Sequence, residues 1–125
     1  MVFTVEHNSD DGIVEARVHA QFDYDLLNQM APQLAAMVHD THCERVLIDF
    51  SAAPISMNTL GILRVPDRLK EIFDAHGVNI HRVKRAIVSP GADRDYEFLQ
   101  VVNQNRGHQF KVFLNEADAR QWLLD

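Results

Sequence analysis

The sequence contains a single cysteine, Cys43, among 125 residues, so no disulfide can form within the chain. Disulfide frameworks are typical of small secreted proteins, whereas a lone cysteine fits a reducing compartment. The N-terminal residues Met1 to Glu6 also lack the basic start, apolar stretch and small-residue cleavage site of a secretory signal. We therefore expect a cytoplasmic protein.

Long hydrophobic runs and an excess of basic residues are both missing. Apolar runs such as Val46-Leu47-Ile48 are far shorter than the ~20 residues that a membrane-spanning helix needs, so no membrane span is expected. The chain has 12 Lys and Arg against 18 Asp and Glu, for a net charge of −6. Because phosphate neutralisation requires clustered Lys and Arg, this balance argues against a nucleic-acid partner.

Motifs of the common catalytic and cofactor sites are also absent. The sequence has no G-x-S-x-G elbow, no H-E-x-x-H pair, no glycine-rich phosphate loop and no G-x-G-x-x-G. Seven histidines are present, and His39 and His42 lie close to Cys43, but that group straddles a helix end and no second cluster completes a tetrahedral site. We expect neither an enzyme nor a bound metal or cofactor.

The chain is long enough for one hydrophobic core, and 46% of its residues are hydrophobic. We expect a single domain over residues 1–125. Residues 2–7 and the alternating segment 13–20 are predicted strands, and the turn cluster 8–12 between them indicates a hairpin.

Strand and helix patterns then alternate to the end of the chain. Helices are predicted over 23–40 and 59–76, from about 93 to 107, and from 115 onward, with strands at 45–50, 84–89 and 110–114. Pro32 and Pro66 should kink the first two helices. The order ββαβαβαβα predicts an α/β fold with a mostly parallel five-stranded sheet and crossover helices mainly on one face.

The segment from Val46 to Ser51, followed by a loop and a helix start at Asn58-Thr59-Leu60-Gly61, resembles the STAS family of SpoIIAA-like anti-sigma-factor antagonists. Asp49 and Ser51 match the Asp and Ser of the family's strand end, with Ala52 in place of its Gly. Thr59 stands where the family has the Ser or Thr that a partner kinase phosphorylates. The neighbouring positions Met57, Asn58 and Leu60 differ from the family's Asp, Ser and Gly.

A second set of motifs is similar to a divergent SpoIIAA-like branch of small bacterial proteins. It comprises Asn105-Arg106-Gly107 before the last strand and the C-terminal run from Glu116 to Leu123. The resemblance implies a SpoIIAA-like fold and a non-enzymatic regulatory or adaptor domain that binds a protein partner, such as a kinase-like anti-sigma factor. It also implies phosphorylation at Thr59.

The fold class is similar to the lipid-binding CRAL-TRIO domains as well. That likeness keeps an alternative open, in which the chain binds a small apolar or anionic ligand between its second and third helices.

Ligands of open α/β sheets gather at the carboxyl ends of the parallel strands, where helix N-termini present unpaired N–H groups. Serine, asparagine and aspartate at such positions also serve as helix caps and turn residues, and both roles stay open here. The predicted partner- or ligand-binding residues are Asp49, Ser51, Ser56, Asn58, Thr59 and Ser89.

A last hypothesis concerns the sheet face turned away from the crossover helices. Counting the alternation along the strands predicts an apolar row there, rimmed by Arg17, Arg45, Arg85 and Lys111. Such a row is typical of a protein interface, although half-burial under neighbouring side chains would explain it equally well. It predicts self-association as a homodimer through Ile13, Leu47, Ile87 and Phe113.

Overall fold

A computed structural model describes residues 2–125, so Met1 of the expected domain lies outside the described residues. Strands β1 (Phe3–Asn8) and β2 (Ile13–Val18) form the expected antiparallel hairpin. Strands β3 (Arg45–Asp49), β4 (Lys84–Val88) and β5 (Gln109–Phe113) then add in parallel. The strand order β1-β2-β3-β4-β5 follows the sequence, which confirms the predicted α/β fold with a mostly parallel sheet.

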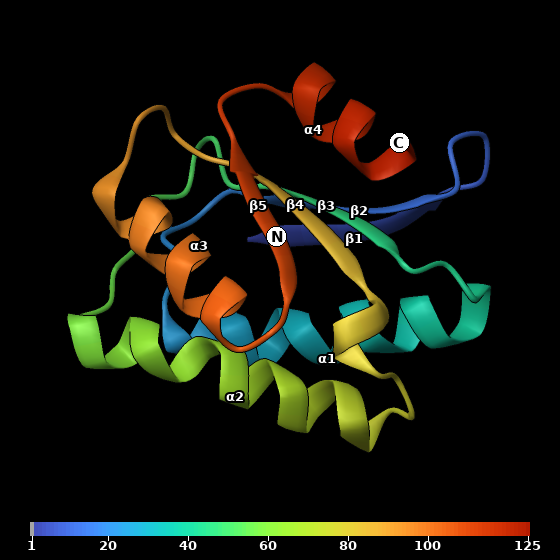
Figure 1. Cartoon of the computed structure of the whole chain (residues 1–125), viewed down its shortest axis with the longest axis horizontal. Coiled ribbons are helices and arrows are strands. Elements are labelled where there is room, and N and C mark those ends of the chain that lie inside the picture. The colour runs from blue at the N-terminus through green and yellow to red at the C-terminus, as the bar shows by residue number, and fades with distance from the viewer. Residues whose placement is uncertain (1) are drawn as a thin grey trace.

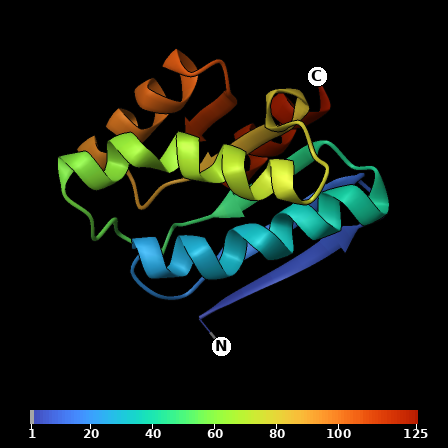
Figure 2. The same ribbon diagram turned by 90° about the horizontal axis from the view of Figure 1, so that it is seen from below.

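Four α-helices cover the two faces of this sheet. Helices α1 (Tyr24–Thr41), α2 (Thr59–Ala75) and α3 (Arg94–Asn105) lie on one face, and α4 (Glu116–Leu124) lies on the other (Figure 1). Viewed from the side of α1 and α2, these two helices lie in front of the sheet (Figure 2). Right-handed crossovers between neighbouring parallel strands place α1, α2 and α3 together, as the element order predicts.

Capping side chains begin each of the four helices. The Asp23 carboxylate accepts a hydrogen bond from the backbone N–H of Leu26 at 2.8 Å, and Asn58, Asp93 and Asn115 cap the other three helices in the same way. Helices α1 and α2 continue through their prolines. The short 3₁₀ helix η1 (Ile80–Arg82) before β4 was not predicted.

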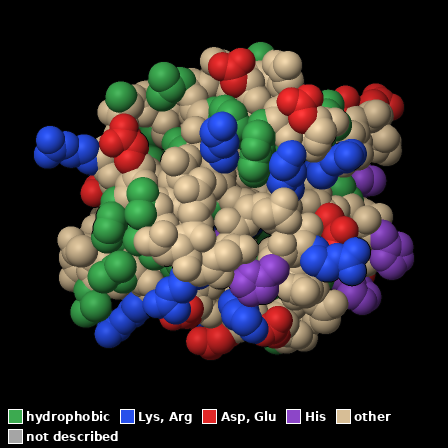
Figure 3. Space-filling view, viewed as in Figure 1, with side chains coloured by type: hydrophobic (Ala, Val, Ile, Leu, Met, Phe, Trp, Pro, Cys, Tyr) green, Lys and Arg blue, Asp and Glu red, His purple; other side chains and the backbone are tan. Residues whose placement is uncertain are grey.

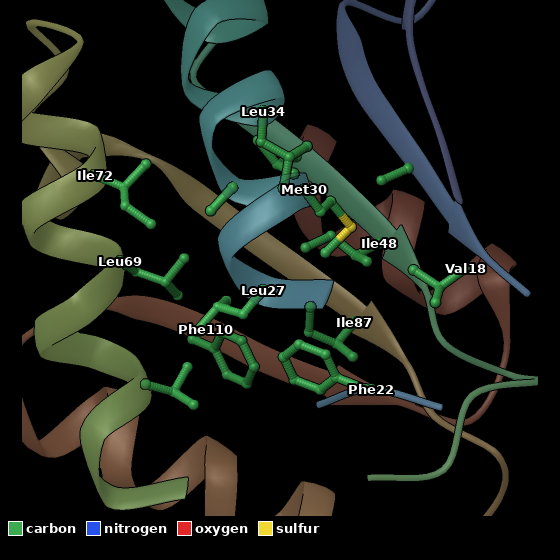
Figure 4. Close-up of a cluster of buried hydrophobic side chains, with 14 of the residues drawn as sticks. Val18, Phe22, Leu27, Met30, Leu34, Ile48, Leu69, Ile72, Ile87 and Phe110 are labelled. Atoms are coloured by element: carbon green, nitrogen blue, oxygen red, sulfur yellow. The ribbon is translucent and has the colours of Figure 1, made fainter. Parts of the chain in front are cut away.

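The main core fills the space between the sheet and helices α1, α2 and α3. Leu27 and Leu34 of α1, Leu69 of α2, and Ile87 and Phe110 of the sheet point into it (Figure 4). These positions follow the apolar stripe that the sequence shows at helical spacing on α1 and α2.

The opposite face carries a smaller apolar cluster beneath α4. Ile13, Leu47, Ala86 and Val88 are buried there against Ala119 and Leu123, with Phe113 and Trp122 packed beside them. A helix on this side was not expected to cover the sheet. The predicted row is therefore covered by the chain itself, and self-association through it would require α4 to move.

The prediction assigned Ile87 and Arg85 to the wrong face of the sheet. Leu47 pairs with Ala86, whereas Ile48 pairs with Ile87, so Ile87 and Ile48 share the face of the main core. Arg85 lies on that same face and is buried, so it is no part of a charged rim under α4. Because side chains alternate along a strand, an error of one residue moves each of them to the other face.

Candidate functional site

The carboxyl end of β3 places Asp49 beside the loop that leads to α2. One oxygen of its carboxylate accepts a hydrogen bond from the Ser51 backbone N–H at 2.9 Å, and the other accepts one from Arg17 Nη1 at 3.0 Å. Burial raises the pKa of Asp49, but hydrogen bonds from Ser51 and the charge of Arg17 leave the net pKa below its ordinary value. Asp49 is therefore an ionised anchor for the loop, while the Ser51 residue itself is exposed.

Ser89 follows the end of β4, but it does not join the exposed residues. Its side chain is buried, and its hydroxyl donates a hydrogen bond to the Gly91 carbonyl at 2.7 Å. Gly91 has a φ of 101°, in the region that favours glycine, so Ser89 stabilises a tight turn before α3. Turn formation accounts for Ser89 here, and a ligand-binding role for it stays a prediction.

The start of α2 is tied to the segment that precedes α1. The Ser56 backbone N–H donates to the Phe22 carbonyl at 2.8 Å, and Phe22 forms a parallel bridge with Ile55. The Asn58 side chain then accepts a hydrogen bond from the Gly61 N–H at 2.8 Å and so caps α2. Asn58 thus has the structural role that its residue type favours, and Thr59 becomes the first, exposed residue of the helix.

Glycine at position 61 permits this close capping turn. A Cβ atom at position 61 would lie 3.2 Å from Met57 Cβ and 3.3 Å from Asn58 Oδ1, closer than side-chain atoms normally pack. The family that the sequence resembles has a glycine at the position of Leu60, and this chain has Gly61 one residue later. The shift leaves Leu60 on the outside of the helix.

Exposed apolar side chains lie close to Thr59 on α2, and another lies on α3. Leu60 is 54% exposed and Leu63 is 41% exposed, and Val101 on the neighbouring helix α3 is also exposed. Figure 3 shows hydrophobic side chains gathered at the left of the molecule, over the start of α2 and over α3. We call Thr59, Leu60 and Leu63 the α2 surface.

The sequence prediction missed Leu60 and Leu63. A signal was present, because both residues fall outside the apolar stripe of Ile62, Val65 and Leu69 that α2 buries. Exposed leucines that lie together on one helix can mark an interaction surface.

A shallow hollow adjoins the α2 surface, between the starts of α1 and α2. It is lined by Asp23, Tyr24 and Asp25 of the α1 start and by Ser56, Met57, Asn58 and Gly61. The hollow therefore carries two carboxylates, of which that of Asp23 already caps α1.

A buried polar cluster formed by Arg85 of β4, Asn103 of α3 and His108 just before β5 was not predicted at all. Arg85 is 2% exposed, and its Nη2 donates to His108 Nδ1 at 2.6 Å and to Asn103 Oδ1 at 3.2 Å. Its guanidinium carbon lies 5.1 Å from the centre of the Phe110 ring. Arg85 Nε is buried and has no hydrogen-bond partner among the described residues.

Burial sets the ionisation of this cluster. It lowers the pKa of Arg85 to about 9, so the guanidinium stays charged at neutral pH. Burial, followed by the charge of Arg85, lowers the pKa of His108 to about 3. His108 is therefore neutral, and because its Nδ1 accepts a hydrogen bond from Arg85, its own proton lies on Nε2.

The candidate metal ligands of the sequence do not come together. Among residues 2–125, no group of three His, Cys, Asp or Glu side chains is placed to hold a metal ion. The Cys43 thiol instead donates to the Gly12 carbonyl at 3.0 Å. Across the same part of the chain, none of the helices combines the length and the apolar character that crossing a membrane requires.

No protein-family model matches the sequence, and neither does any curated protein. Among solved structures, an uncharacterized protein of the DUF3478 family with a SpoIIAA-like fold, from Shewanella loihica PV-4, is 20% identical with a TM-score of 0.57. That match covers 97% of this chain and 91% of the other. The anti-sigma factor antagonist SpoIIAA in its unphosphorylated form is 12% identical with a TM-score of 0.53, over 96% of each chain. At these identities the likeness shows the fold, which is SpoIIAA-like.

Proposed function

We propose that this chain is a non-enzymatic regulatory or adaptor domain that binds a protein partner through the α2 surface. The observation that carries the proposal is Thr59 at the exposed start of α2, flanked by the exposed side chains of Leu60 and Leu63. The similar fold of SpoIIAA, whose name describes an anti-sigma factor antagonist, supports a regulatory role. A cytoplasmic location, which the lone cysteine favours, belongs to the same proposal.

Partner binding at this surface has a physical basis. Removing apolar side chains from water is the main favourable contribution to most protein association. Leu60 and Leu63 lie near the start of α2, which is fixed by the Asn58 cap and by the bridge between Phe22 and Ile55. Little conformational entropy would be lost when a partner covers them.

Phosphorylation of Thr59 would regulate this binding. A phosphate adds about −1.5 to −2 charges at neutral pH. At the first residue of α2 it would interact favourably with the helix dipole, so the fold would tolerate it. The same charge beside Leu60 would make the apolar surface costly to bury, and the partner would dissociate.

The first test concerns the modification itself. The chain is incubated with ATP and with the kinase-like anti-sigma factor whose gene lies nearest to its own, and the products are analysed by peptide mass spectrometry. We expect one phosphate, on Thr59, and none in Thr59→Val. Thr41→Val serves as the control, because the Thr41 hydroxyl donates to the Met37 carbonyl and lies away from the α2 start. An unmodified Thr59 would contradict the switch.

The second test separates binding from phosphorylation. Leu63→Asp should weaken binding of the same anti-sigma factor at least tenfold in calorimetry, because a buried apolar contact would become a buried charge. Leu124→Asp is the matched control, since Leu124 is similarly exposed but lies on α4, on the other side of the sheet. Equal affinities for both variants would place the interface elsewhere.

A further inference from the structure

The main core contains an internal site that the proposed function does not use. A cavity of ≈ 30 Å³ lies between α1, α2 and the sheet. Its lining is apolar except for one charged group, and includes Leu27, Leu34, Leu69, Phe73, Phe110 and Arg85. Figure 4 shows the apolar side chains of α1, α2 and the sheet that meet around this space.

Within residues 2–125, no side chain balances the charge of Arg85. Its hydrogen-bond acceptors, Asn103 and His108, are both neutral, and no carboxylate of the described residues forms an ion pair with it. Its Nε–H donor is buried without a partner. A buried charge is normally paired, because leaving water without a counterion costs several kilocalories per mole.

A positive charge without a counterion calls for a bound anion, not for a metal ion or a basic ligand. We propose that Arg85 binds the carboxylate of an aliphatic monocarboxylic acid, whose hydrocarbon chain lies between α1, α2 and the sheet. A carboxylate supplies the single negative charge that one guanidinium balances, and its oxygen accepts the Nε–H. The apolar lining favours a hydrocarbon chain over a hydrated inorganic anion.

The cavity is too small to hold the whole ligand. A space of ≈ 30 Å³ holds the head group but not an alkyl chain, so α2 must move outward as the chain enters. Helix α2 packs on the sheet through buried side chains such as Leu69 and Phe73, which separate from the strands as α2 moves. The movement breaks no hydrogen bond of the sheet, because its ladder joins only the strands, and local openings of this kind are used by ligand sites.

The decisive experiment follows the Arg85 Nε–H group by NMR. In ¹⁵N-labelled protein its resonance is assigned by its loss in Arg85→Met. Titration with octanoate should shift this resonance and the backbone amides of α1 and α2, whereas octan-1-ol should leave the Nε–H resonance unmoved. Affinity should rise about fourfold per methylene from butanoate to octanoate, as the chain leaves water.

Arg85→Met should bind octanoate at least tenfold more weakly, with octanol affinity unchanged. The variant should fold, because a buried unpaired charge is replaced by an apolar chain of similar length, and its melting temperature should rise by a few degrees. Arg82→Met is the matched control, since Arg82 is exposed and pairs with Glu44 at 3.4 Å. It should retain wild-type binding.

Two results would overturn the proposal. An Nε–H resonance that octanoate does not move would mean that a trapped water satisfies Arg85, and equal octanoate affinity in Arg85→Met would mean that the charge plays no part. The octanoate and octanol titrations of the wild-type protein decide the question even if the variant fails to fold. Neither outcome bears on Thr59, because the α2 surface is tested with a protein partner.

Discussion

The two faces of the sheet hold their charged side chains in opposite ways. Beneath α4, Arg120 pairs with Glu15 at 2.8 Å and with Asp11 at 2.7 Å, and Arg17 pairs with Glu116 at 3.0 Å. On the other face, Arg85 is buried with only neutral partners. The first face therefore uses paired charges to fasten a helix, whereas the second retains a charge without a counterion.

The arginines that form ion pairs are partly exposed, whereas the fully buried arginine has no ion pair. The network under α4 is partly exposed, so water and neighbouring carboxylates both stabilise its arginines. Burial raises the pKa of Glu15, but hydrogen bonds from Asn8 and Arg120 leave the net pKa below its ordinary value. Arg85 has no such compensation, which is why its cluster should dominate the response to mutation and pH.

The largest effect should come from removing the main acceptor of Arg85. His108→Leu leaves a buried guanidinium with a lost hydrogen bond, and we expect the free energy of unfolding to fall by about 3 kcal/mol in urea denaturation. The double variant Arg85→Met/His108→Leu should recover most of that loss, because no buried charge remains. A single-variant loss below about 0.5 kcal/mol would mean that the two faces do not differ in this way.

A smaller effect should appear as pH falls from 6.5 to 5. The pKa of His108 lies at about 3 in the fold against an ordinary value of 6.5, so its contribution is complete above 6.5 and is lost as pH falls toward 3. Stability should decline by about 1.4 kcal/mol per pH unit once the unfolded histidine is protonated.

The pH range from 6.5 to 5 isolates this histidine. Asp49 and Glu15 have lowered pKa values and ordinary values of 3.8 and 4.5, so their contributions are lost only at lower pH. Urea denaturation at three pH values in this range measures the slope, and His108→Asn should flatten it. An equal slope in that variant would assign the effect to another histidine.

The smallest effect should come from the network beneath α4. Arg120→Met removes contacts to Glu15, Asp11 and Glu116, yet these groups are partly exposed and can be hydrated. We expect a loss of about 1 kcal/mol at low salt, and a smaller loss in 1 M NaCl because the charges are screened. A loss as large as that of His108→Leu would remove the contrast between the faces.

Much of the fold could be predicted because its signals are local. Helices α1 and α2 begin at residues 24 and 59, within one residue of the predicted starts, and the alternation of β2 gives the face it buries. The position of Thr59 at a helix start follows from the Asn58 cap. The exposure of Leu60 and Leu63 could also have been predicted, because both residues fall outside the buried stripe of α2.

The roles of α4, Ile87 and Arg85 could not be predicted in the same way. An amphipathic C-terminal helix can pack on either face of a sheet, and its own sequence does not state which. Strand β4 is buried on both faces, so its near-continuous apolar run gives no phase, and Ile87 was assigned to the wrong side. Arg85 sits within that run and was taken for a surface residue.

The sequence by itself determined the order of elements, their caps and the parallel sheet, because each depends on residues near one another in the chain. Tertiary structure alone decided which face α4 covers, which apolar side chains remain exposed around Thr59, and which partners surround Arg85. The partners of Arg85, for example, come from α3 and from the segment before β5, far from β4 in the sequence. Burial and charge balance depend on which distant segments pack together, so a local sequence pattern cannot predict them.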